Sequence, residues 1–491
     1  MKKSISKNYI YNIIYQMLIL LVPLITTPYI SRVLTVEGIG IYSFTYSTAT
    51  FFALLAELGS FAYARREIAY CQDNKEKRSI IFWETLILRV ITTAVCLVVY
   101  LIYVLNSKYV AIGLIQMIYI IAVVFDITWF YQGLENFGTI VIRNSAIKLL
   151  GMLFIFLFVK DENDLVIYVL GLAAITLIGN IITWSNISKY VKRISLKSLK
   201  PLRHLKGTIA LFIPNIASQV YLLLDKTMLG FLTVDSIENG YYEQSQKIIR
   251  IAWTFITTFS AVMAPRIAYI YMKNDKKALN EYMSKSFNTI WLLSSALCFG
   301  IISIADNIVP WFLGNEYNKV ITLLIIFAFI LFPIGITSVT GTQYLITLKK
   351  HKIYTVSIVI GAIFNFIINC CLIPKYYSIG TAISSVIAEW IIAIIQIIYI
   401  VYYIKEISIK EIFSHSWQYI FSGLVMFLCL RIISLSMSSS VYNSILLIVI
   451  GAMIYFVILI ILKNKLILEG IEKIKITLKD IRNKTNKNDI K

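Results

Sequence analysis

Long apolar stretches dominate this chain and recur at nearly regular intervals, separated by short polar segments. Most of them are close to the length of roughly 20 residues that an α-helix needs to cross the hydrocarbon core of a bilayer. The segment 441–462 contains no Asp, Glu, Lys or Arg. A helix in the core of a soluble protein does not need so long a stretch without charge. The pattern predicts an all-α integral membrane protein.

Hydropathy predicts about fourteen transmembrane helices. They are expected near residues 11–31, 41–62, 80–104, 109–130, 141–159, 165–186, 208–230, 243–264, 286–309, 319–341, 353–373, 379–404, 416–436 and 441–462. We expect two pseudo-symmetric six-helix lobes, residues 1–186 and 208–404, joined by a cytoplasmic linker at 187–207. Two further helices within 405–462 and a basic cytoplasmic tail at 463–491 complete the prediction.

The distribution of basic residues provides an independent test of this count, because cytoplasmic loops are enriched in Lys and Arg. If both termini are cytoplasmic, most of the 46 basic residues lie in cytoplasmic segments. The outer segments then hold only Arg32, Lys108, Lys160, Lys319, Lys375 and Arg431. One missed helix would invert every later loop, so the asymmetry supports the count. We expect a bacterial plasma membrane protein whose tail lies on the inner leaflet or in solvent.

Composition excludes several other classes of protein. The net charge of +20 does not indicate nucleic-acid binding, because the basic residues lie between apolar stretches rather than along one face. The six cysteines show no disulfide or metal-site spacing, and there is no phosphate-binding loop. The three histidines have no acid or nucleophile at a diagnostic spacing, and no outer loop is long enough for chemistry. We therefore expect no enzyme activity, no cofactor and no metal site.

A weak internal repeat accompanies the two predicted lobes. Residues 34–46 read LTVEGIGIYSFTY and residues 232–246 read LTVDSIENGYYEQSQ, and both follow a span that contains proline. Each places an acid and then a glycine–aromatic step in an outer turn. Transporters are often built from duplicated halves with the substrate site between them, so this match favours a duplication.

Ionisable residues inside the predicted spans are the best candidates for function, because each is costly in hydrocarbon and usually faces a cavity or a partner. The acidic members are Glu57, Glu84, Asp126, Asp225, Glu243 and Glu389. The basic residues that could line a cavity, either within spans or at their ends, are Arg32, Arg143, Lys148, Lys226, Lys247 and Arg250. Arg89 could form a structural ion pair with another helix or contact substrate, and Arg32 and Arg143 could instead reach to the interface. Asp225 and Lys226 are adjacent and so cannot face the same direction on a helix.

Several segments resemble Wzx-type polysaccharide flippases, which belong with MATE exporters and the lipid II flippase MurJ in one superfamily. The resemblance is carried by PYISRVLTVEGIGIYSF at 28–44, ARREIAY at 64–70, DITWFYQGLENFGTIVIRN at 126–144, LLLDKTMLGF at 222–231 and the run from Gly341 to Glu389. It extends to about residue 400. The family pattern has a basic residue at Arg32, one arginine in the step where this chain has Arg65 and Arg66, and an acid–base pair at Asp225–Lys226.

The resemblance implies a flippase that translocates undecaprenyl-pyrophosphate-linked oligosaccharide repeat units by alternating access, for O-antigen, capsule or exopolysaccharide assembly. A mostly positive cavity suits its anionic head group, because Arg and Lys replace lost hydration. Asp126, Asp225 or Glu389 would be the ion-coupling carboxylates. Partners would be the lipid-linked oligosaccharide, membrane lipids, a polysaccharide polymerase and a chain-length regulator, with no nucleic acid. The alternative is a MATE-type ion-coupled antiporter of small cationic compounds, which would favour twelve spans and an acidic cavity.

Overall fold

The computed structural model describes residues 5–404, 408–473, 475 and 476, apart from the side chains of 5–14, 213–215 and 217–222. Every regular element within these residues is a helix. The α-helices are α1 (Ile5–Val33), α2 (Thr35–Glu57), α3 (Ser60–Tyr70), α4 (Lys75–Leu105), α5 (Val110–Phe125), α6 (Thr128–Gly133), α7 (Phe137–Phe158), α8 (Leu165–Ile182), α9 (Leu205–Leu232), α10 (Ile237–Met272), α11 (Lys276–Phe312), α12 (Asn318–Ala328), α13 (Leu331–Thr337), α14 (His351–Ile398), α15 (Ile409–Ile412), α16 (Ser416–Ser434) and α17 (Val441–Ile461).

Shorter helical turns connect these helices. They are η1 (Glu162–Asp164), η2 (Thr183–Lys189), η3 (Leu196–Ser198), η4 (Pro201–His204), η5 (Asn315–Tyr317) and two π-helical segments, η6 (Ser338–Ile346) and η7 (Tyr399–Ile404). Several helix starts are fixed by side-chain caps that satisfy free backbone N–H groups. The side chains of Asn74, Asp275 and Ser440 accept from the backbone N–H three residues later, at the starts of α4, α11 and α17.

Twelve segments in the described residues are long and apolar enough to span a membrane, which confirms a multi-pass membrane protein. One of them, residues 351–404, is a helical hairpin, because Tyr377 has φ 54° and ψ −131° and interrupts α14. Gly361 on the first arm packs directly on Ile392 of the second, and Gln396 donates to Ser357 at 3.0 Å. The predicted span at 208–230 corresponds to α9. These two cases account for the difference between twelve segments and the fourteen predicted spans.

Internal contacts divide the chain into two compact units. The first unit comprises Met1–Gln244 and Asn365–Thr381, and the second comprises Ser245–Phe364 and Ala382–Lys491. These boundaries differ from those of the predicted lobes, whose division at 187–207 stays a prediction. The predicted surface tail is helical over residues 465–473, and residues 477–491 lie outside the described part of the chain.

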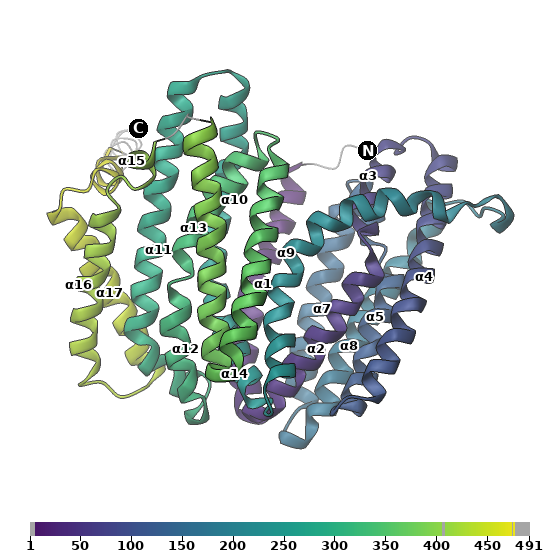
Figure 1. The fold of residues 1–491 in the computed structure, drawn as a ribbon, viewed down its shortest axis with the longest axis horizontal. Coiled ribbons are helices and arrows are strands. Elements are labelled where there is room, and N and C mark those ends of the chain that lie inside the picture. The colour runs from purple at the N-terminus through teal and green to yellow at the C-terminus, as the bar shows by residue number, and fades with distance from the viewer. Residues whose placement is uncertain (1–4, 405–407, 474, 477–491) are drawn as a thin grey trace, which may run out of the picture. The chain divides into compact units, whose positions relative to one another are not determined.

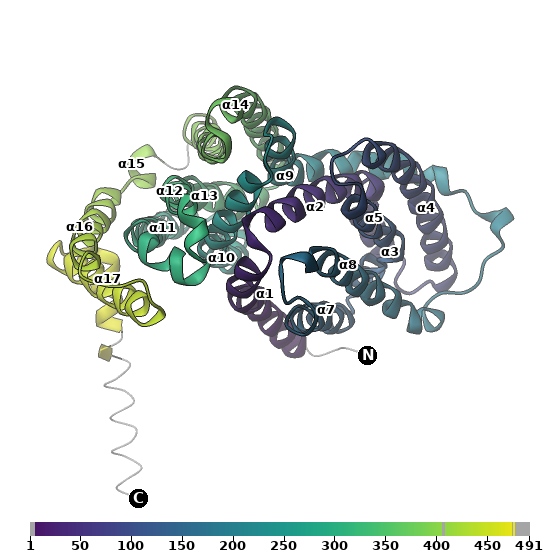
Figure 2. The same ribbon diagram turned by 90° about the horizontal axis from the view of Figure 1, so that it is seen from below.

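The first unit is a helical bundle in which α2 packs against α4, α5 and α9, and α7 packs against α1 and α8 (Figures 1 and 2). A cluster of buried aromatic residues fixes α3, α4 and α6 to the linker. Phe82 stacks on Trp129 with ring centroids 5.5 Å apart, and Phe130 and Val191 complete the buried core around them. The predicted linker is therefore an ordered part of this unit.

A sharp turn separates α2 from α3 inside what hydropathy indicates as one span. Leu58 and Gly59 both have positive φ, at 46° and 69°. A side chain at Gly59 would lie 2.6 Å from the Thr208 carbonyl oxygen and 2.7 Å from the Phe212 nitrogen, both on α9. Glycine is needed here because the backbone of α9 passes too close for a Cβ atom and because φ is left-handed.

The two segments of the internal repeat cross each other in the first unit. A Cβ atom at Gly40 of α2 would lie 1.8 Å from the Ser236 carbonyl oxygen. Reciprocally, a Cβ atom at Gly240 of α10 would lie 2.2 Å from the Val36 carbonyl oxygen. Gly240 lies 200 residues after Gly40, and Ser236 lies 200 residues after Val36, so the two contacts are reciprocal. The hydrogen bond between Ser43 and Glu243, which are also 200 residues apart, lies near the same crossing.

In the second unit α11 is the central helix and packs against α12, α13, α16 and α17 (Figure 1). Small residues allow close approach, since a Cβ atom at Gly423 of α16 would lie 2.3 Å from the Phe299 ring. Hydrogen bonds reinforce the contact: Ser295 donates to the Tyr419 carbonyl at 2.6 Å, and Trp291 donates to the Ile412 carbonyl at 2.8 Å. The last two spans are therefore an integral part of this unit.

Replacing Gly40 by Ala should destabilise the protein by about 1–3 kcal/mol, because the new Cβ meets a backbone carbonyl that cannot move aside. The matched control is Gly300→Ala in α11, where the nearest atom to the new Cβ is the flexible Met426 terminus at 4.0 Å. Thermal unfolding in detergent should show a lower midpoint for Gly40→Ala only. Equal midpoints for both variants would contradict the close crossing.

Candidate functional site

Three helices of the first unit bring an acid–base pair together within the membrane-spanning region. Lys226 of α9 lies 2.5 Å from the Glu243 carboxylate of α10, and the Ser43 hydroxyl of α2 donates to the same carboxylate oxygen at 2.8 Å. Both charged side chains are largely covered, with 14% and 11% of their surfaces exposed. The pair satisfies the requirement that a charge removed from water have a partner and additional hydrogen bonds.

The neighbouring Asp225 faces a different set of partners. Its carboxylate accepts from the Tyr242 hydroxyl at 2.6 Å and from the Asn369 amide at 2.7 Å, and the residue is 2% exposed. Asn239 donates to the Lys226 carbonyl at 2.9 Å. The prediction that Asp225 and Lys226 face different directions is confirmed. Together these contacts form a buried polar network that joins α2, α9, α10 and the first arm of α14.

Tyrosines gather on α2, α5 and α8 beside this network. Tyr42 stacks on Tyr46 with centroids 5.3 Å apart, and Tyr168 meets Tyr42 edge-on at 5.0 Å. Tyr119 meets Tyr46 edge-on at 5.1 Å. Tyrosine rings provide flat apolar faces with a polar tip. The sequence could not single out these four among its 32 tyrosines.

A second set of buried charges joins α2, α4 and α5. Arg89 is 1% exposed and donates to the Asp126 carbonyl oxygen at 2.6 Å. The carboxylates of Glu57 and Asp126 interact electrostatically with its guanidinium. Asp126 also accepts from the Thr128 N–H at 2.9 Å and from the Thr128 hydroxyl at 2.6 Å, which fixes the start of α6. Of the two interpretations of Arg89, the structure supports a contact between helices.

A third polar cluster was missed by sequence reasoning, which found no acid at a diagnostic spacing from any of the three histidines. His204 lies 2.7 Å from the Glu84 carboxylate, and the Tyr63 hydroxyl lies 2.8 Å from its other ring nitrogen. Arg203 pairs with the same carboxylate, which also accepts from the Lys200 N–H at 2.7 Å. The available signal was Glu84 itself, since an acid within an apolar span requires a basic partner. The cluster attaches the linker to α4.

The remaining predicted cavity residues divide into paired and exposed groups. Arg66 pairs with Glu67 at 2.9 Å, and Arg65 donates to Gln132 at 3.3 Å. Arg32 is exposed and Lys247 half-buried, and both have interactions with other residues. Lys148 of α7 and Arg250 of α10 are exposed, and neither side chain has an ion pair or hydrogen bond within the described residues.

Glu389, the third predicted coupling carboxylate, belongs to the second unit. It is 6% exposed, and its carboxylate interacts electrostatically with the Tyr354 hydroxyl. An uncharged network lies in the same unit: Ser260 lies 2.7 Å from Ser338, Gln343 donates to Ser260 at 2.9 Å, and Thr340 donates to Gln396 at 2.6 Å. Ser338, Thr340 and Gln343 belong to π-helical η6, a geometry often found at functional sites.

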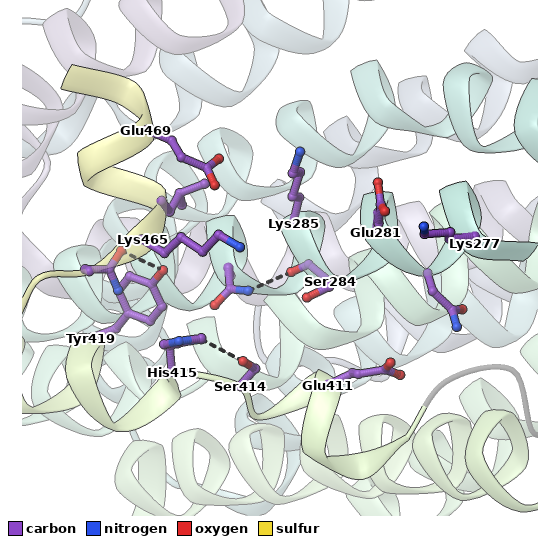
Figure 3. Close-up of a pocket in the computed structure, with 14 residues that line it drawn as sticks. Lys277, Glu281, Ser284, Lys285, Glu411, Ser414, His415, Tyr419, Lys465 and Glu469 are labelled. Atoms are coloured by element: carbon purple, nitrogen blue, oxygen red, sulfur yellow. Dashed lines mark hydrogen bonds between the residues drawn. The ribbon is translucent and has the colours of Figure 1, made fainter. Parts of the chain in front are cut away.

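Arg143 lines a cavity of about 550 Å³ between α7 and α8 in the first unit. A second cavity, of about 600 Å³, lies in the second unit between the start of α11, the start of α16 and the segment after α17 (Figure 3). Lys285, Lys465 and His415 line it together with Glu281, Glu411 and Glu469, so its charges are mixed. Within the part of the chain that the structure describes, no group of three His, Cys, Asp or Glu side chains is arranged to hold a metal ion.

Comparison with known proteins gives concordant results. The family model described as polysaccharide biosynthesis protein matches residues 5–271, more than half of the chain. A protein of Escherichia coli K12 named "Putative O-antigen transporter" is 22% identical over 405 residues, covering 81% of this chain and 97% of that protein.

Solved structures show the same fold. The lipid II flippase MurJ in an inward closed conformation aligns with a TM-score of 0.74 at 15% identity, covering 94% of this chain and 100% of that one. An inward-facing MATE family multidrug resistance transporter aligns with a TM-score of 0.60 at 14% identity, covering 84% and 96%. The fold class predicted from hydropathy is confirmed, and so is the family resemblance stated from the sequence motifs.

Replacing Glu243 by Gln should destabilise the protein strongly, by about 3–5 kcal/mol, because Lys226 is left without its counter-charge. The double variant Lys226→Met, Glu243→Met removes both charges and should recover most of that loss. The measurement is the unfolding midpoint in detergent for the two variants and the parent chain. A double variant as unstable as Glu243→Gln would show that the pair does not act as a unit.

Proposed function

This chain belongs to the polysaccharide biosynthesis protein family, and we propose that it is a flippase for undecaprenyl-pyrophosphate-linked oligosaccharide repeat units. It moves each unit from the cytoplasmic to the outer leaflet of the bacterial plasma membrane for assembly of a surface polysaccharide. Both termini lie in the cytoplasm, in agreement with the distribution of basic residues. A polysaccharide polymerase and a chain-length regulator then act on the units it delivers.

The observation that carries the proposal is Arg250. It lies within a membrane-spanning helix, is exposed, and has no ion pair or hydrogen bond in the described residues. A guanidinium inside a membrane is costly unless it faces water, a partner or an anion. A pyrophosphate is an anion in which two oxygens of one phosphate can accept parallel hydrogen bonds from the planar guanidinium fork, and a lipid-linked sugar of this kind must bring one across the bilayer.

The other predicted basic residues also contact the head group during transport in this proposal. Arg32, Lys148 and Lys247 would hold the head group, with Lys226 exchanging between Glu243 and the substrate. Arg65 and Arg66 would bind the head group at the entrance. The polyprenyl chain stays in lipid, because transferring it into a polar chamber would expose apolar surface to water.

Transport by alternating access requires two states that bind the head group, one open to the cytoplasm and one open to the outer side. Asp225, Asp126 and Glu389 are the carboxylates that we propose for ion coupling. Asp225 is the strongest of the three, because it is 2% exposed and its carboxylate accepts hydrogen bonds from Tyr242 and Asn369, while its neighbour Lys226 already has a carboxylate partner.

Deletion of the gene should leave lipid-linked repeat units on the cytoplasmic side and remove the surface polymer. The measurement is the sidedness of radiolabelled lipid-linked sugar in inverted vesicles, together with surface polymer detected by antibody or lectin. Normal polymer with altered sensitivity to cationic drugs alone would favour an ion-coupled exporter instead.

Substituting Arg250 by Ala should lower transport at least tenfold, the cost of one charge-assisted contact of roughly 1.4 kcal/mol or more. Lys352→Ala is the matched control, because Lys352 is exposed at the start of α14 and outside the predicted spans. Transport by each variant is measured in cells at equal membrane levels. Equal transport by both variants would remove Arg250 from the substrate path.

A further inference from the structure

The cavity beside Arg143 has two chemically distinct ends. Apolar side chains line it along α7 and α8, among them Ile147, Leu150, Ile175 and Ile178. Polar side chains from the connection before α7 and from η2 line the other end, with Arg143 and Lys189 as its two cations. Its volume of about 550 Å³ is within the usual range for sites that hold one small ligand.

The cationic end has binding capacity that the protein does not use. Arg143 donates from Nη1 to the Asn144 side chain at 2.7 Å, but its buried Nε has no hydrogen-bond partner in the described structure. The Lys189 side chain is exposed and has no ion pair or hydrogen bond in the described residues. Its backbone carbonyl accepts a hydrogen bond from the Lys75 side chain at 2.9 Å. A buried donor without an acceptor is costly, so an anion between these two cations would stabilise the site.

The apolar end is open to its surroundings. Ile142, Leu150 and Ile178 line the cavity yet are 62%, 52% and 54% exposed. In a membrane these surfaces face acyl chains. The glycine at 179 keeps α7 and α8 close below the groove, since a Cβ atom there would lie 2.5 Å from Ile147.

We propose that this groove binds one anionic phospholipid of the cytoplasmic leaflet. The phosphate lies between Arg143 and Lys189, and one acyl chain lies along Leu150 and Ile178. The distribution of basic residues puts this end of α7 on the cytoplasmic side, where anionic lipids and basic pockets between helices pair. A free phosphate would use only the cationic end and leave the apolar surface without a partner.

The site has a structural consequence that is independent of the transported substrate. Lys189 belongs to η2 at the start of the linker, and Arg143 belongs to α7. η2 already contacts this part of the unit through the hydrogen bond from Tyr131 to the Thr183 carbonyl at 2.7 Å. A phospholipid bound to both cations would connect α7 to the linker and stabilise their arrangement.

The test is native mass spectrometry of the full chain with phosphatidylglycerol or phosphatidylcholine, combined with unfolding midpoints in detergent. The parent chain should retain one phosphatidylglycerol and gain stability from it, and phosphatidylcholine should bind roughly tenfold more weakly. Arg143→Gln combined with Lys189→Gln should abolish the preference for the anionic lipid. Lys192→Gln, an exposed lysine of the same linker, should leave it unchanged.

A second variant tests the apolar end without removing charge. Ala146 is exposed and lines the cavity, so Ala146→Phe should fill the groove, fold normally and weaken phosphatidylglycerol binding. Equal binding of the two lipids, or retention of phosphatidylglycerol by the double Gln variant, would overturn the proposal. Equal stabilisation by inorganic phosphate alone would also overturn it, because the acyl chain would then play no part.

Discussion

A charge within the hydrocarbon core of a membrane needs an opposite charge, hydrogen bonds or water, and this requirement determines much of the packing in the first unit. Lys226 binds Glu243, Arg89 binds the main chain at Asp126, and Glu84 binds the linker. The first two contacts join segments that hydropathy treats as independent spans, and the third joins a span to the linker. The polar network thus specifies which apolar helices meet, which apolar packing alone specifies poorly.

The spans and the fold class could be predicted from the sequence because bilayer thickness fixes the length of every apolar segment. The interruptions within spans could not. The turn at Leu58–Gly59 depends on how closely α9 approaches, and residues of α9 lie about 150 positions further along the chain. The π-helical segment Ser338–Ile346 likewise accompanies contacts with Ser260 and Gln396, which no local pattern indicates.

The same limit applies to the candidate site. Ionisable residues in spans are expected to be functional or paired. This rule selected Asp225, Lys226, Arg89 and Glu243, all of which have polar partners in the structure. It could not choose their partners, because Ser43 and Glu243 are 200 residues apart and Glu84 and His204 are 120 apart. Lys226 was predicted as a cavity cation, and its ion pair shows why charge alone overstates the positive potential that a span residue provides. Arg250 and Lys148 are exposed, and their assignment to a substrate cavity stays a prediction.

The crossing of α2 and α10 has an implication for how such a chain could arise. Gly40 contacts Ser236, and Gly240 contacts Val36. Gly240 is the repeat counterpart of Gly40, and Ser236 is the counterpart of Val36, so exchanging the two repeats turns one contact into the other. This reciprocity is the definition of an isologous interface, the kind that two identical subunits form about a twofold axis. A half-length ancestor with this helix would have dimerised through it. Fusion of two copies would then have converted an association between subunits into a permanent internal contact, leaving each half free to acquire its own polar side chains, such as Ser43 on one side and Glu243 on the other.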